Sequence, residues 1–439
     1  MSIPTSSSAR PLAPFLTIWG GQLFSLIGST IAQFALVWWL TQTTNSATVL
    51  ATASLVAMLP GIFVGPLAGA FVDRWNRRRV MIVADSVGAL MALGLAILFW
   101  THTLQVWHIY LAMLVRSLAG SFHWPAMQSS TSLMVPQEHL TRVAGLNHTT
   151  FGIMNVFGPP LGALLLGILP LHGVMLVDVV TATIAISPLF FIRIPQPAAV
   201  AHPTGGATSV WADLLAGLRY VRAWPGLLLL LGMAMLINFV LTPAGSLTPL
   251  LVTRHFRGAA LQLGWLNSAW GIGVVLGGVT LSAWGGFRRR SITSLTGLTL
   301  MGVGFVIVGV APANALWLAI VGNLVAGLMN PITNAPLIAM LQAVVEPQMQ
   351  GRIFTLIGSL SGAMSPLSLA IAGPLADVIG VRAWYVMGGL LCTIIGIGAF
   401  FIPAIVRLEE NHRHTAQTMD PSRDQGQPAL AAATLAVTE

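Results

Sequence analysis

Long apolar runs dominate this sequence and limit the folds that are open to it. Each run has about 20 residues or more, the length at which a helix crosses the hydrocarbon core of a bilayer. A helix also satisfies its own backbone hydrogen bonds, as a segment surrounded by lipid must. The runs therefore predict an all-α polytopic membrane protein with twelve transmembrane helices. The predicted helices are 14–40, 47–72, 80–101, 105–125, 143–168, 174–192, 226–252, 261–285, 291–312, 315–342, 353–379 and 383–405.

The composition excludes an ordinary soluble enzyme. Only 7% of the 439 residues are charged and 55% are hydrophobic, whereas about a quarter of the residues in a soluble domain are charged. The apolar runs contain no nucleophile motif and no metal-ligand spacing, and the single cysteine, Cys392, excludes an internal disulfide. We therefore expect neither an enzyme nor a bound metal or cofactor.

All 20 basic residues are arginines, and their positions predict the orientation of the chain. Sixteen fall on one side of the predicted helices, and only Arg254, Arg257 and Arg382 fall on the other. Because Lys and Arg collect in cytoplasmic loops, we expect both termini in the cytoplasm and the protein in the inner membrane of a bacterium. The arginines are spread over short loops rather than gathered on one basic face, so we expect the lipid bilayer and not nucleic acid as a partner.

The predicted helices fall into two sets of six with related features. Arg77-Arg78-Arg79 precedes the third helix and Arg288-Arg289-Arg290 the ninth, and Gly158-Pro159 is matched approximately by Gly373-Pro374. A repeat of about 210 residues is typical of transporters in which two bundles rock about a shared site. We expect an N-terminal six-helix bundle (1–194), a cytoplasmic linker with an amphipathic surface helix (195–225), a C-terminal six-helix bundle (226–405) and a disordered cytoplasmic tail (406–439).

A motif rich in glycine and charge ends the second predicted helix, with the sequence Gly69-Ala-Phe-Val-Asp73-Arg74-Trp-Asn-Arg77-Arg78-Arg79. Gly69 ends a ridge, with Gly61 and Gly65, that suits close helix packing. The carboxylate of Asp73 would be attracted to a helix N-terminus and could pair with Arg77 or Arg78.

This motif resembles motif A of the major facilitator superfamily, with Phe71 in place of Leu and Asn76 in place of the second Gly. The resemblance implies that the motif latches the two halves together on the cytoplasmic side and opens during the transport cycle. The same arginines also serve as topology determinants. The residues implied in this gating role are Gly69, Asp73, Arg74, Arg77 and Arg78.

Asp85, Arg116 and Asp178 lie inside predicted spans. An ionisable side chain at such a depth faces a partner or a water-filled cavity, and either carboxylate could carry a proton. Arg116, followed four residues later by Gly120, is similar to motif B of the same superfamily, which implies a part in proton coupling. The alternatives are a structural ion pair for Arg116, pairing of Asp85 with the motif A arginines, and contact of Asp178 with the outer headgroups.

The fifth predicted helix contains Gly158-Pro159-Pro160-Leu-Gly162-Ala, which resembles motif C of the antiporter branch. Small residues and prolines give a pliable, closely packed helix at the interface between the halves. The resemblance implies that Gly158, Pro159 and Gly162 belong to an exporter rather than an importer. A structural kink with no bearing on the direction of transport is the alternative.

Neutral polar stripes occur on helices that line the central cavity in this superfamily. Polar residues among aromatic residues and methionines suit a bulky amphipathic ligand better than a sugar phosphate or a peptide, which would need more fixed charge. Hydrogen bonding between helices is the alternative role for each residue. The candidate cavity residues are Gln22, Ser25, Ser29 and Gln33 on one face of the first helix, Asn238 and Thr242 on one face of the seventh, and Asn330 on the tenth.

Local phrases narrow the resemblance to one group. Ser25-Leu-Ile-Gly-Ser-Thr-Ile-Ala-Gln33, Asn45-Ser-Ala-Thr-Val-Leu and Leu218-Arg-Tyr-Val-Arg222 are similar to the macrolide-efflux transporters of the drug:H⁺ antiporter-3 group. This resemblance implies a monomeric exporter of hydrophobic or amphipathic small molecules, driven by the proton gradient through alternating access. Export of an endogenous siderophore or lipid-like compound by the same fold is the alternative.

Overall fold

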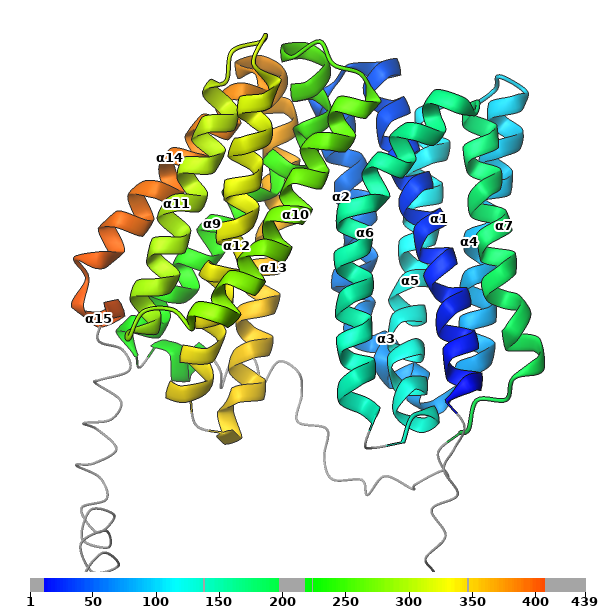
Figure 1. Ribbon diagram of the computed structural model, residues 1–439, viewed down its shortest axis with the longest axis horizontal. Coiled ribbons are helices and arrows are strands. Elements are labelled where there is room, and N and C mark those ends of the chain that lie inside the picture. Colours follow the sequence, from blue (N-terminus) through cyan, green and yellow to red (C-terminus); the bar gives the residue numbers. More distant parts are fainter. Residues whose placement is uncertain (1–11, 137–138, 197–217, 223, 346, 407–439) are drawn as a thin grey trace, which may run out of the picture.

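The computed structural model describes residues 12–136, 139–196, 218–222, 224–345 and 347–406 (Figure 1). All regular secondary structure within these residues is helical. The predicted disordered tail and most of the predicted linker, including the first part of its amphipathic helix, lie outside the described residues. The remaining part of that helix, 218–222, is helical and buries Val221.

The helices follow the order that the apolar runs predict. The N-terminal half contains α1 (Ala13–Thr44), α2 (Ala47–Phe63), α3 (Gly65–Arg74), α4 (Arg77–Trp100), α5 (Val106–Met134), α6 (Leu140–Ile168) and α7 (Leu171–Phe191). The C-terminal half contains α9 (Pro225–Leu250) with a π-helical turn (Leu251–His255), α10 (Ala260–Trp284), α11 (Arg290–Val310), α12 (Leu316–Val344), α13 (Pro347–Ile379), α14 (Val381–Phe400) and α15 (Pro403–Val406). In the described part of the chain, 10 helices are long and apolar enough to cross a membrane. The pair α2–α3 and α5 complete the twelve predicted segments.

Two of the predicted helices show the largest departures from the prediction. The second run is divided at Val64 into α2 and α3. Pro66 lies in the first turn of α3, where a backbone N–H has no acceptor within the helix, so its absence costs no helical hydrogen bond. Helix α5 continues past Pro125 to Met134, although the sequence there becomes polar. A helix needs apolar residues only where lipid surrounds it, so the apolar run of this segment is shorter than the helix α5 itself.

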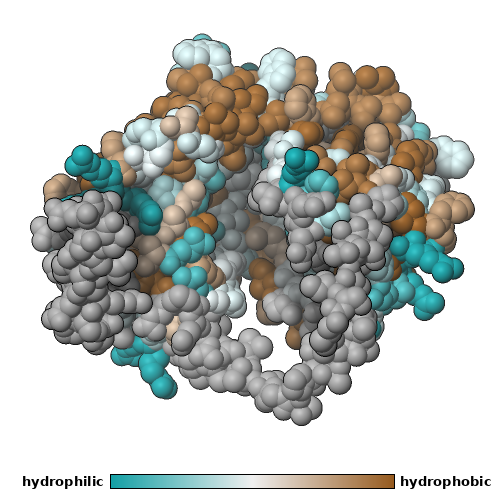
Figure 2. Space-filling view, turned by 60° about the horizontal axis from the view of Figure 1, so that its bottom comes forward, coloured by the Kyte–Doolittle hydropathy of each residue, from teal (hydrophilic) through white to brown (hydrophobic). Residues whose placement is uncertain are grey.

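The two halves form bundles that converge at one end and diverge at the other (Figure 1). They diverge at the end where α1 begins and α14 ends, which the arginine distribution predicts to be cytoplasmic. We call this the inner end and the opposite one the outer end. The surface on the inner side is hollowed between the halves (Figure 2). The molecule is therefore open at the inner end and closed at the outer end.

Glycines let the halves pack closely where they meet. Helix α6 lies against α10, and α2 lies against α13. A Cβ atom on Gly271 of α10 would lie 2.9 Å from the backbone of Asn155 in α6. One on Gly373 of α13 would lie 2.8 Å from the side chain of Ala51 in α2. Larger residues at these two glycines would force the halves apart.

A proline in α6 leaves a backbone carbonyl free to accept a hydrogen bond from the other half. Pro160 lacks an N–H, so the carbonyl oxygen of Val156, one turn earlier, has no helical donor. The hydroxyl of Ser268 in α10 donates to this oxygen at 2.7 Å. The contact between α6 and α10 is thus polar as well as close.

The glycine ridge of motif A has no close neighbour in this arrangement. Among the described atoms, a Cβ on Gly61, Gly65 or Gly69 would meet nothing within 4 Å outside its own helix. The close packing that the sequence predicts for this ridge is therefore absent here. Gly358 and Gly362, in the inner part of α13, are equally open. Both sets lie toward the inner end, where the halves diverge.

Candidate functional site

A small cavity of about 140 Å³ inside the N-terminal half collects ionisable side chains from α4, α5 and α7, and we call it the charged cavity. Arg116 and Asp178 form an ion pair there, with Nη1 2.5 Å from Oδ2. The hydroxyl of Ser29 in α1 donates to the other carboxylate oxygen at 3.1 Å, and Arg116 donates to that hydroxyl at 3.0 Å. Asp178 is only 2% exposed. It therefore faces the bundle interior rather than the outer headgroups.

Asp85 occupies the other side of the charged cavity. It accepts a hydrogen bond from Gln22 at 2.8 Å, and His123 Nε2 lies 3.4 Å from its second oxygen. Among the described residues, these two side chains are its partners, in place of the motif A arginines that the sequence offers as an alternative. The sequence analysis missed His123, although it lies seven residues after Arg116 and so on the same face of α5.

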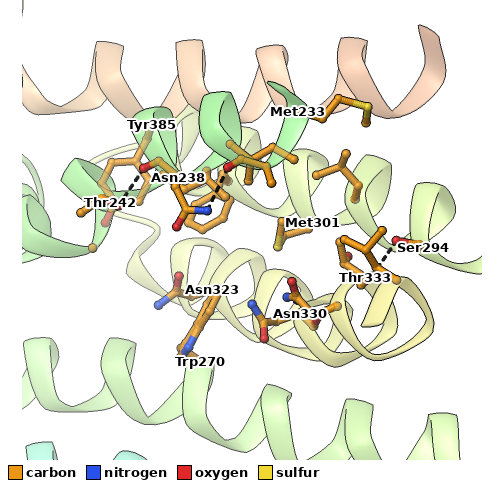
Figure 3. Close-up of a pocket in the computed structure, with 18 of the residues that line it drawn as sticks. Met233, Asn238, Thr242, Trp270, Ser294, Met301, Asn323, Asn330, Thr333 and Tyr385 are labelled. Carbon is orange, nitrogen blue, oxygen red and sulfur yellow. Dashed lines mark hydrogen bonds between the residues drawn. The ribbon is translucent and has the colours of Figure 1, made fainter. Parts of the chain in front are cut away.

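A larger cavity of about 580 Å³ lies mainly within the C-terminal half, between α9, α11 and α12 (Figure 3). Of the described residues that line it, none carries a carboxylate, guanidinium or imidazole group. Its polar groups are amides and hydroxyls beside Met233, Met301 and Trp270. We call it the neutral cavity.

The neutral cavity brings together Asn238, Thr242 and Asn330, as the polar stripes predict. Asn238 and Asn330 project into it from α9 and α12, on opposite sides (Figure 3). Within the described residues, no three His, Cys, Asp or Glu side chains gather as a metal site would require. The lining residues that sequence analysis did not propose include Asn155, Asn267, Ser294, Met301 and Tyr385.

The polar stripe of α1 faces a different site from the one proposed for it. Gln22, Ser25 and Ser29 line the charged cavity, and two of them hydrogen-bond to its carboxylates. Gln33, further along the same helix, is exposed. Helix α1 packs against α6 and α7 of its own half, so most of its polar face points into that bundle and not toward the neutral cavity.

In the described part of motif A, Arg78 contacts its own half. The Arg78 guanidinium donates to the carbonyl oxygens of Leu189 and, at 2.6 Å, Phe190, at the end of α7. Those carbonyls have no helical donor, and a cation is favoured at a helix C-terminus. Arg77 is buried and Arg74 is exposed, while the side chain of Asp73 lies outside the described atoms. Gly69, described above, is open.

Motif C contacts both halves with different atoms. A Cβ on Gly158 would lie 2.5 Å from Thr30, and one on Gly162 2.9 Å from Phe34, so the two glycines accommodate α1 of the same half. Pro159 faces the other way and lines the neutral cavity. Its carbonyl oxygen would lie 3.4 Å from a Cβ on Gly264 of α10.

A third polar cluster closes the outer end, and we call its members Asn45, Ser46, Thr48, Arg254 and Asp377 the outer clasp. Asp377 in α13 accepts hydrogen bonds from the N–H groups of Ala47 (2.8 Å) and Thr48 (3.0 Å), at the start of α2. Arg254 lies 3.3 Å from Asp377 and donates to the Asn45 side chain at 3.0 Å. A carboxylate is favoured at a helix N-terminus, and here it comes from the opposite half.

Comparisons with known proteins agree with this architecture. A family model described as Major Facilitator Superfamily matches residues 18–256 and 227–436. Macrolide efflux protein A of Streptococcus pyogenes is 32% identical over 90% of this chain and 97% of its own length. The multidrug efflux pump Tap of Mycolicibacterium fortuitum is 27% identical over the same shares.

Solved structures show the same fold. A bacterial homologue of the iron transporter ferroportin, in its inward-facing state, matches with a TM-score of 0.67 at 16% identity, covering 88% of this chain and 98% of that chain. The nucleoside transporter NupG matches with a TM-score of 0.64 at 12% identity, over 89% and 99%. The twelve helical segments in two bundles and the family match together establish that this chain is a multi-pass membrane protein of the major facilitator superfamily.

Proposed function

We propose that this protein exports bulky amphipathic small molecules of the macrolide class across the inner membrane, in exchange for protons. The neutral cavity is the observation that carries this proposal. Its volume of about 580 Å³ lies within the range of small-molecule sites. Relatives named for macrolide and multidrug efflux align over nearly the whole chain, which supports the same substrate class.

The chemistry of the neutral cavity favours ligands with many weak polar groups. Amides such as Asn238 and Asn330 both donate and accept hydrogen bonds, and so match hydroxyl, ester and ether oxygens. Met301 and Trp270 supply polarisable apolar contact. The described lining has no cationic side chain, so a phosphorylated or zwitterionic substrate would leave its negative charge unpaired there, at a cost of several kcal/mol.

Export requires the outer end to open and the inner end to close. The outer clasp and the contact between α6 and α10 then separate, while the inner parts of α2–α3 and α13 approach each other. The open glycines Gly65 and Gly358 leave space for that approach. In this scheme motif A latches the closed inner end, and Arg77 or Asp73 engages the C-terminal half only in that state.

The energy source in this proposal is the proton gradient, with no bound cofactor. A proton bound in the charged cavity drives the cycle only if the inward-facing and outward-facing states bind it with different affinity. The protein acts as a monomer, because one chain encloses the neutral cavity, and both termini lie in the cytoplasm. Its partners are the bilayer and the exported compound.

Purified protein in liposomes tests the proposal directly. When the lumen is acidic, protons that leave through protein inserted inside-out should drive labelled erythromycin into the liposomes. Liposomes treated with a protonophore should not accumulate it. Accumulation that ignores the pH gradient would contradict proton exchange, whereas failure to move erythromycin under any gradient would contradict the substrate class. Liposomes loaded with an iron-chelating siderophore distinguish the alternative cargo.

A further inference from the structure

We propose that Asp85 and His123 together form the proton-binding site of this exporter, and that Asp178 stays ionised throughout the cycle. The inference rests on the proton exchange proposed above and assigns it to particular atoms. It depends on how the four ionisable side chains of the charged cavity are paired.

Asp178 is already neutralised. Arg116 contacts one of its oxygens at 2.5 Å and Ser29 donates to the other at 3.1 Å. A further proton on Asp178 would remove the negative charge that pairs with the guanidinium and leave that cation uncompensated inside the bundle, which is unfavourable. The ion pair therefore contributes no net charge to the cavity, and protonating Asp178 would break it.

Asp85 has a different environment. Its hydrogen-bond donor, Gln22, is neutral, and its remaining neighbour is the His123 ring at 3.4 Å. With neutral imidazole the pair carries one negative charge, and one proton makes it neutral overall. That proton resides on Nε2 of His123 or on the carboxylate, which lie 3.4 Å apart.

Apart from the Arg116–Asp178 pair, the other charged side chains described on the neighbouring helices lie away from Asp85 and His123. From α1 the cavity receives only the neutral side chains Gln22, Ser25 and Ser29, and α2 contains no ionisable residue. On α4, Arg77 lies two turns nearer the inner end, about 12 Å along the helix, and Arg78 is engaged at the end of α7. Arg74 of α3 lines a separate groove along α4 and α5.

Accessibility to water separates the two carboxylates as well. The side chains of Asp85 and His123 are 10% and 14% exposed, whereas that of Asp178 is 2% exposed. A proton site must exchange with water in at least one state of the cycle. Of the two carboxylates, Asp85 is the more exposed in this state, while the Nε2 atom of His123 beside it is buried.

The test compares His123→Gln with His108→Gln, a matched histidine at the outer end of α5, well before the charged cavity. Export of erythromycin driven by a pH gradient should fall about tenfold or more in His123→Gln, because the Asp85 carboxylate loses the ring that shares its proton and the difference in proton affinity between the two states shrinks. Erythromycin counterflow at equal pH needs no net proton movement and should persist, which also demonstrates a folded protein. His108→Gln should behave as the wild type in both assays.

A second variant tests whether Asp178, which the proposal leaves ionised, takes part in proton binding. Replacing both partners, in Arg116→Gln/Asp178→Asn, removes the ion pair without leaving one charge alone, and should retain the pH-dependence of export. Wild-type pH-dependence in His123→Gln, or its loss in the double variant with counterflow intact, would overturn the assignment. A wild-type protein that moves erythromycin without responding to pH would instead refute proton exchange itself.

Discussion

The two halves place a cavity among corresponding helices but fill it with different chemistry. In the N-terminal half, the first, third, fourth and sixth spans enclose about 140 Å³ lined by two carboxylates, a guanidinium and an imidazole. The corresponding spans of the C-terminal half line about 580 Å³ of amides, hydroxyls and apolar groups. One bundle architecture therefore supports a charged site in one half and a neutral one in the other.

The repeat in the sequence accounts for the difference in charge. When Arg77 is matched to Arg288, a spacing of 211 residues, the positions of Asp85, Arg116, His123 and Asp178 correspond to Thr296, Gly327, Asn334 and Gly389. All four counterparts are uncharged. In the scheme proposed above, corresponding positions of the repeat therefore form a proton site in the N-terminal half and a substrate site in the C-terminal half.

Arg116→Ala should have the largest effect, because it leaves the buried carboxylate of Asp178 without its cation. We expect a loss of about 3–5 kcal/mol in the stability of the N-terminal half, measured as a lower midpoint of thermal unfolding in detergent. Thr333→Ala, in the lining of the neutral cavity, removes a hydroxyl that bonds within its own helix and should cost less than about 1 kcal/mol. Equal midpoints for the two variants would show that the two cavities do not differ as described.

Asp377→Asn should come next and affect both cavities together. The amide is a weaker acceptor for the N–H groups at the start of α2, so the outward-facing state should gain about tenfold in population, or ~1.4 kcal/mol. Distances between spin labels at Thr103→Cys and Asn314→Cys, in exposed outer loops, report this opening once the single native Cys392 is replaced by Ala. Arg257→Gln, an exposed outer arginine beyond the clasp, is the control. An unchanged distance distribution in Asp377→Asn would remove the clasp from the gating scheme.

Asn330→Ala and Asn238→Ala should have the smallest effects, confined to the neutral cavity. Each removes amide groups that face the substrate in our proposal, so the KM for erythromycin should rise about fivefold, or ~1 kcal/mol. The pH-dependence of export should stay unchanged, in contrast to His123→Gln. Gln33→Ala, on the exposed part of α1, serves as the control. A KM for Gln33→Ala that rises as much as for Asn330→Ala would mean that the substrate lies between the halves and not within the C-terminal one.

Much of the fold could be predicted from the apolar runs, because lipid forces nearly every apolar run of sufficient length into a helix. The bounds of α7 and α10 differ from the prediction by only a few residues at either end. The prediction was less accurate where the ends of a helix do not coincide with the ends of an apolar run. This is the case at the polar end of α5 and at the division at Val64.

The candidate sites were less predictable than the helices. Asn238, Thr242 and Asn330 do share a cavity, but Gln22, Ser25 and Ser29 belong to another one. Helical periodicity places residues on one face of a helix, and it carries no information about the neighbour that this face meets.

The sequence by itself determined the membrane location of the chain, its helices, its duplicated plan and its superfamily, since each of these depends on local composition or on motifs along one segment. Only the tertiary structure decided which charges are neighbours. Asp178 meets Arg116 across 62 residues and Asp85 meets His123 on an adjacent helix, while Asp377 caps a helix of the opposite half. Electrostatic interactions depend on separation in space, and in a bundle of twelve segments that separation is set by packing rather than by position along the chain.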